Sequence, residues 1–122
     1  KKNVKDISKF TYTVCGIGEQ NGHSFTTSNK VGRIKDSGNV KVPIKTIDSF
    51  QYQNVGFIKY DIEGYELRAI KGSEQTIKKY FPVIIVEQNK GNTDAVELLQ
   101  SWGYKLKGID DMFKSDYLMV KQ

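Results

Sequence analysis

Apolar residues follow two different patterns along the 122-residue chain, and the change falls near residue 54. Residues 1–53 alternate apolar and polar positions in short runs, which is typical of strands. Residues 54–122 combine continuous apolar runs with helix-spaced ones, which indicates an α/β arrangement. No repeat or Pro/Gly/Ser-rich linker separates the two parts. We therefore expect one domain over residues 1–122, with a β-rich part followed by an α/β part.

The β-rich part predicts several short strands. Residues 10–17 alternate aromatic and β-branched side chains, and the pair Asn21-Gly22 follows as a strong signal for a tight turn. We expect a β-hairpin that returns through residues 23–27. Two further strands are expected at residues 31–36 and 39–44.

The α/β part begins with an apolar run, residues 55–62, that closes on acidic residues. Such a run is typical of a buried parallel strand. A helix is expected to start at Gly64 and to stop before Pro82, because the residue preceding a proline is disfavoured in a helix. Residues 83–87 form the next apolar run, so these segments predict a right-handed βαβ unit.

The last part of the chain predicts one helix and two strands. The helix runs over residues 93–102, with Gly103 as its C-terminal stop. Residues 104–109 and 116–120 read as strands, and we expect them to form an antiparallel pair at the edge of the sheet.

Three acidic residues follow or end the two buried strands: Asp61, Glu63 and Glu87. Ligands of open α/β sheets bind beyond the carboxyl ends of the parallel strands, so these residues are candidates for a functional site. If strand geometry persists through Ile62, Asp61 and Glu63 point to the same face. The structural alternative is that Asp61 caps the following helix and Glu63 favours its positive N-terminus. The coincidence of acids at two neighbouring strand ends favours the functional interpretation.

Composition and charge restrict the partners. The net charge is +5, but the lysines are scattered along the chain, which indicates a solvated surface and gives no strong nucleic-acid signal. A non-enzymatic basic binding module stays open as an alternative. There is no apolar run that predicts a membrane span or signal peptide, and the lone Cys15 suits a reducing compartment. We therefore expect a cytoplasmic protein.

The segments TIDSF, FIKYDIEGYELRAIKGSEQTIKK and PVIIVE resemble, in order and spacing, the FkbM family of S-adenosylmethionine-dependent methyltransferases. The resemblance is specific over about residues 40–90 and looser on both sides. The matching positions are Thr46, Asp48, Lys59, Asp61, Glu63, Gly64, Glu66, Lys71, Gly72, Pro82 and Glu87.

This resemblance implies a Rossmann-like class I methyltransferase sheet and methyl transfer from S-adenosylmethionine to a hydroxyl of a small-molecule or glycan acceptor, such as a sugar or a secondary metabolite. A hydroxyl is a poor nucleophile until its proton is removed, so a carboxylate has to assist. Asp61 is the candidate for this position, next to the cofactor, with Glu63 and Glu87 as helpers. Magnesium or calcium would suit such carboxylates, but the spacing does not demand a metal.

The resemblance also implies that most of the cofactor cradle is missing from this chain. Enzymes of this class hold the cofactor through a Gly-rich turn after the first strand and an acid after the second, and neither is present. We therefore expect the chain to be the C-terminal two-thirds of a methyltransferase domain, truncated at its N-terminus. The segment Cys15, Gly16, Ile17 and Gly18 resembles the end of the third strand of the family, which implies a contact with the cofactor; the structural alternative is a plain tight turn.

A carbohydrate-active hydrolase is the alternative enzyme. The Asp61/Glu63 pair also resembles the strand end of chitinase-like barrels, in which paired carboxylates act on a glycosidic bond. Such a barrel needs about 250 residues, which argues against this alternative for a chain of this length.

Overall fold

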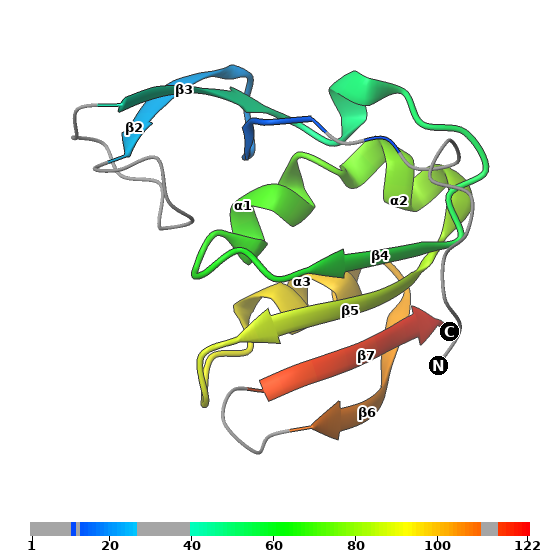
Figure 1. The fold of residues 1–122 in the computed structure, drawn as a ribbon. Coiled ribbons are helices and arrows are strands. Elements are labelled where there is room, and N and C mark those ends of the chain that lie inside the picture. Colours follow the sequence, from blue (N-terminus) through cyan, green and yellow to red (C-terminus); the bar gives the residue numbers. More distant parts are fainter. Residues whose placement is uncertain (1–10, 12, 27–39, 111–114) are drawn as a thin grey trace, which may run out of the picture.

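The computed structural model describes residues 11, 13–26, 40–110 and 115–122, which form two sheets and three α-helices (Figure 1). The larger sheet has four strands in the order β4-β5-β7-β6. Strands β4 (Phe57–Tyr60) and β5 (Val83–Gln88) are parallel, whereas β7 (Ser115–Lys121) is antiparallel to both β5 and β6 (Tyr104–Asp110). The expected antiparallel pair at the sheet edge is therefore confirmed.

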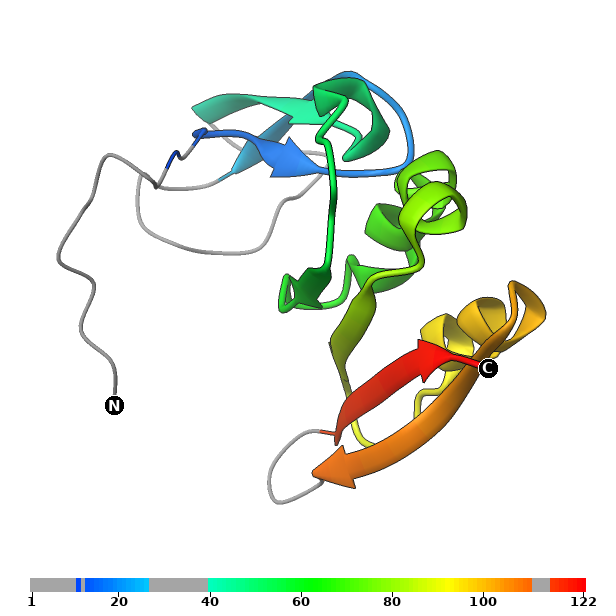
Figure 2. The same cartoon turned by 90° about the vertical axis from the view of Figure 1, so that its right-hand side faces the viewer.

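The helices all pack on one face of this sheet (Figures 1 and 2). They are α1 (Glu66–Lys71), α2 (Glu74–Tyr80) and α3 (Asp94–Ser101). No helix among the described residues is long and apolar enough to cross a membrane. On the opposite face of the sheet, Phe57 and Val83 stay 54% and 37% exposed.

The core lies between the sheet and the helices. Tyr60, Val86 and Tyr117 stand side by side in one row of the sheet, and all three are buried. Ile70 and Leu99, from α1 and α3, are fully buried against this face. These side chains pack the ends of β4 and β5 into the core, at the edge of the sheet where Asp61 and Glu87 lie.

The expectation of a single helix between Gly64 and Pro82 is wrong, because two short helices occupy this segment. The chain breaks between them at Gly72, the C-terminal cap of α1. A β-carbon on Gly72 would stand 2.1 Å from the carbonyl oxygen of Gly18. The backbone of the small sheet therefore rests directly on this break.

The strand order of the smaller sheet differs from a second expectation. Its strands β1 (Gly16–Ile17), β2 (Gly22–Thr26) and β3 (Val40–Lys45) have the order β1-β3-β2. The predicted hairpin between residues 10–17 and 23–27 does not form, because β3 lies between these strands. β3 pairs parallel with β1 and antiparallel with β2.

The pair Asn21-Gly22 has a different role from the expected tight turn. The side-chain oxygen of Asn21 accepts a hydrogen bond from the backbone N–H of Thr46 at 2.9 Å. This bond ties the segment before β2 to the residue that follows β3. The strand predicted at residues 31–36 lies outside the described residues.

Candidate functional site

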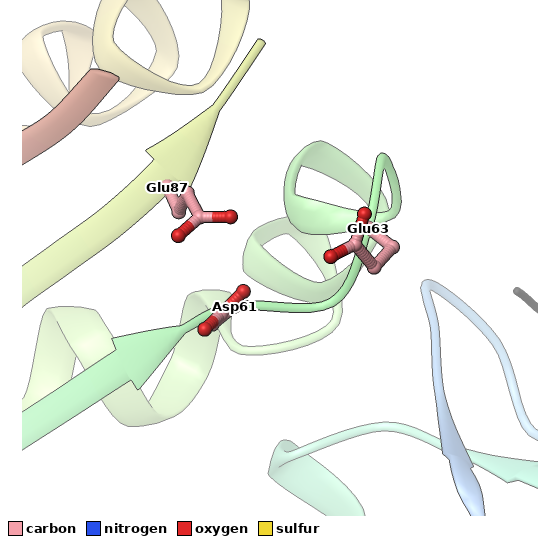
Figure 3. A group of neighbouring side chains, drawn as sticks. All are labelled: Asp61, Glu63 and Glu87. Atoms are coloured by element: carbon pink, nitrogen blue, oxygen red, sulfur yellow. The ribbon is translucent and has the colours of Figure 1, made fainter. Parts of the chain in front are cut away.

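The carboxyl ends of β4 and β5 bring the three predicted acids together (Figure 3). Asp61 directly follows β4, Glu87 lies near the end of β5, and Glu63 lies in the turn before α1. One carboxylate oxygen from each residue lies within 4.8 Å of those of the other two. Asp61 and Glu63 are exposed and Glu87 is partly buried, so this carboxylate cluster is open to solvent. It has the donor type that hard cations prefer, although exposed acids often converge without a metal.

The turn brings Glu63 into the cluster by a route that the sequence analysis did not foresee. Strand β4 ends at Tyr60, so strand alternation does not continue through Ile62. Instead Glu63 has a left-handed backbone with φ 52°, and Gly64 follows with φ 98°. The expectation that Asp61 and Glu63 share a face because of strand geometry is wrong; a turn makes them converge.

Glu66 holds this turn. It is the first residue of α1 and only 3% exposed, and its carboxylate accepts hydrogen bonds from two backbone N–H groups of the turn. The donors are Ile62, at 2.8 Å, and Gly64, at 3.0 Å. The N-cap of α1 is Tyr65, without a side-chain cap bond, so the alternative that Asp61 caps this helix is wrong.

Tyr60 anchors the end of β4 beneath the cluster. Its hydroxyl donates to Ser73 Oγ at 2.7 Å, and Ser73 in turn donates to the carbonyl of Ala69 at 2.7 Å. Burial raises the pKa of the Tyr60 hydroxyl well above its usual value, although the hydrogen bond with Ser73 opposes the shift. Tyr60 is therefore a neutral structural group in the core.

Asp48 and Gly72 fasten the small sheet to the helical layer. The Asp48 carboxylate accepts bonds from the backbone N–H groups of Gln75 and Thr76, at 3.1 and 2.9 Å, and from the Thr76 hydroxyl at 2.7 Å. These are the first-turn amides of α2, which have no partner inside the helix. The backbone N–H of Asp48 donates to the Gly72 carbonyl at 3.0 Å.

A cleft of about 280 Å³ lies between the small sheet and the start of α1. Ile17 and Gly18, two of the predicted cofactor contacts, form part of its wall, whereas Gly16 is buried and Cys15 half-buried outside it. The remaining lining residues are Glu19, Gln20, Asn21, Gly22, His23, Ser24, Ile44, Tyr65 and Arg68. The cleft therefore combines apolar side chains, an aromatic ring and polar groups.

Tyr65 links the cleft to the carboxylate cluster, because it lies two residues after Glu63 and forms part of the cleft wall. The Arg68 guanidinium lies over the Tyr65 ring, 5.1 Å from its centroid. Sequence reasoning named neither Arg68 nor His23 as a site residue, although both line the cleft and His23 is exposed. It named Glu66 and Asp48 only as motif positions. The available signal for Glu66 was an acid in the first turn of the expected helix, where negative charge is favoured.

Comparison with known proteins identifies the family. The sequence profile described as the Methyltransferase FkbM domain matches residues 2–106. This chain belongs to the FkbM methyltransferase family. The crystal structure of methyltransferase FkbM from Methylobacillus flagellatus KT has the same fold as this FkbM chain, with a TM-score of 0.65 and 23% identity. The alignment covers 93% of this chain but only 30% of the bacterial chain. No curated protein matches the sequence.

Proposed function

We propose that this FkbM chain carries the acceptor side of an S-adenosylmethionine-dependent O-methyltransferase. The observation that carries the proposal is the convergence of Asp61, Glu63 and Glu87 at the carboxyl ends of two parallel strands. When bound, S-adenosylmethionine would supply an electrophilic methyl group on a positively charged sulfur. Three carboxylates this close form a site of concentrated negative charge, which attracts a cationic group. The parallel β4 and β5, joined through α1 and α2, support a Rossmann-like sheet.

Asp61 has the central role in this proposal. It would accept the proton of the acceptor hydroxyl, whose oxygen would take the methyl group that S-adenosylmethionine supplies when bound. Glu63 and Glu87 accept further hydrogen bonds from the acceptor and orient it. Because Asp61 and Glu63 are exposed, an acceptor reaches them from solvent. A sugar or a hydroxylated secondary metabolite offers the required hydroxyl.

The cleft fits the adenosine part of the cofactor. Ile17, Ile44 and the Tyr65 ring offer apolar surface for a flat base, and polar groups such as Glu19 offer partners for the ribose hydroxyls. Gly16 pairs with Ile44 of β3, which lines the cleft, whereas Cys15 is not part of the lining. The chain spans 30% of the length of the solved relative.

Calorimetry tests the cofactor proposal. S-adenosylmethionine should bind the protein expressed from the complete reading frame, and bind this chain weakly or not at all. If the complete protein shows no binding, the cofactor proposal is wrong.

Asp61→Asn tests the reaction centre in the same complete protein. Losing a proton acceptor at the reacting oxygen should lower kcat about 100-fold or more, with a much smaller loss of cofactor affinity. Glu74→Gln is the matched control, because it removes an exposed carboxylate that pairs with Lys78 on the surface of α2. Unchanged turnover in Asp61→Asn would remove Asp61 from the mechanism.

The family match favours methyl transfer over the two other functions considered from the sequence. A glycosidase would use the same carboxylates, and a basic binding module would use the scattered lysines. Neither is favoured by the domain match over residues 2–106. Incubating the complete protein with S-adenosylmethionine and a panel of sugars separates the enzymatic alternatives, because a methyl ether and a cleaved glycoside differ in mass.

A further inference from the structure

The Glu66 carboxylate is buried where a charge is costly unless it is hydrogen-bonded. Each of its oxygens accepts a different backbone N–H: Oε2 from Ile62 and Oε1 from Gly64. Charge-assisted bonds of this kind are stronger than neutral ones. One side chain therefore fastens the turn on both sides of Glu63.

Glu63 needs this support because its backbone is left-handed, with φ 52°. For a residue other than glycine this conformation costs about 1–2 kcal/mol. It persists only where the surroundings impose it. If the bonds to Ile62 and Gly64 were lost, the turn could relax, and the Glu63 carboxylate would leave the other two acids.

We propose that Glu66 is a positioning residue that holds the Glu63 carboxylate beside Asp61 and Glu87. This inference rests on the proposed function for its kinetic consequence, but its structural part is independent. Glu66 is itself buried beneath the turn and is not a member of the carboxylate cluster. It acts through Glu63.

Asp48 provides a matched control, because its carboxylate also accepts two backbone N–H groups at a helix start. Those amides belong to α2, outside the turn that carries Glu63. Replacing either acid by its amide removes the charge and substitutes a donor for one acceptor. Both replacements should lower stability, whereas only the change at Glu66 should disturb the cluster.

A double-mutant cycle in the complete protein tests the inference. Glu66→Gln should lower kcat about tenfold or more, because a displaced Glu63 no longer orients the acceptor, and misplacing substrate by an ångström can cost up to about 100-fold. In a Glu63→Gln background, Glu66→Gln should lower kcat almost no further, because the Glu63 carboxylate through which Glu66 acts is already absent. Asp48→Asn should leave kcat within about twofold of wild type in both backgrounds. Independent, multiplying losses from Glu66→Gln and Glu63→Gln would overturn the inference.

An NMR measurement separates failure of this inference from failure of the proposed function. In Glu66→Gln, the amide resonances of Ile62 and Gly64 should shift, and the backbone and carboxyl resonances of Glu63 should shift with them. In Asp48→Asn these resonances should stay in place. Unmoved Glu63 resonances in Glu66→Gln would overturn the positioning role even in an active enzyme. Moved resonances in a protein that transfers no methyl group would support the structural role and refute the proposed function.

Discussion

Replacing Gly72 by alanine sets two physical effects against each other. Gly72 has an ordinary helical backbone, with φ −75° and ψ −1°, at the end of α1. Helix propensity alone therefore predicts that Gly72→Ala stabilises the protein by about 1 kcal/mol or less. The new β-carbon, however, would stand 2.1 Å from the backbone oxygen of Gly18 and 3.2 Å from the Thr46 β-carbon. A backbone oxygen cannot rotate away, so the two segments have to separate by about 1 Å.

The separation has a cost that can be estimated from the contacts around it. Overpacking of this kind costs about 1–3 kcal/mol. The bond from the Asp48 N–H to the Gly72 carbonyl, 3.0 Å long, lies at the same junction and would weaken. Its loss adds about 1 kcal/mol. Steric repulsion therefore outweighs propensity, and the net expectation is a destabilisation of about 1–3 kcal/mol.

Urea unfolding followed by far-UV circular dichroism measures this difference. Gly56→Ala is the control, because a β-carbon there meets nothing within 4 Å. We expect the control to stay within about 0.5 kcal/mol of wild type. If Gly72→Ala is as stable as wild type or more stable, the close packing of the small sheet on the α1–α2 junction is wrong.

Two further predictions concern stability. Asp48→Ala removes the bonds to the first turn of α2 and should lower the free energy of unfolding in urea by about 1–2 kcal/mol. Glu74→Ala removes a surface ion pair and should lower it far less. Equal losses in the two variants would contradict the capping role of Asp48. Burial raises the pKa of the Tyr104 hydroxyl from 10.0 to about 12, so its contribution to stability is complete below pH 10 and is lost as the pH rises towards 12. Tyr104→Phe should therefore flatten the dependence of unfolding free energy on pH across this window, and an unchanged slope would show that Tyr104 titrates normally in the folded state.

The sequence predicted the elements whose signals are local. The apolar runs of β4 and β5 and the helix-spaced residues of α3 lie within a few residues of their predicted bounds. The acids at the strand ends were also predictable, because parallel strands present their carboxyl ends at one edge of a sheet. The motif around Asp61 likewise led to the FkbM family that the domain match shows.

The pairing of the small sheet was not predictable in the same way. Asn21-Gly22 is a local turn signal, but β3, which comes about twenty residues later in the chain, inserts between β1 and β2. Strand partners are chosen by hydrogen bonds between distant segments, and a turn dipeptide carries no information about a third strand. The close approach of Gly18 to Gly72, at the break between α1 and α2, is likewise a contact between distant segments.

By itself, then, the sequence determined which acids end or follow the two parallel strands and at which edge of the sheet they stand, because strand periodicity and motif spacing are properties of neighbouring residues. Only the tertiary structure decided how Asp61 and Glu63 converge. Two acids separated by one residue meet here because a buried Glu66 holds a left-handed turn. Burial and backbone strain depend on the surrounding fold, so this contact could be found only in three dimensions.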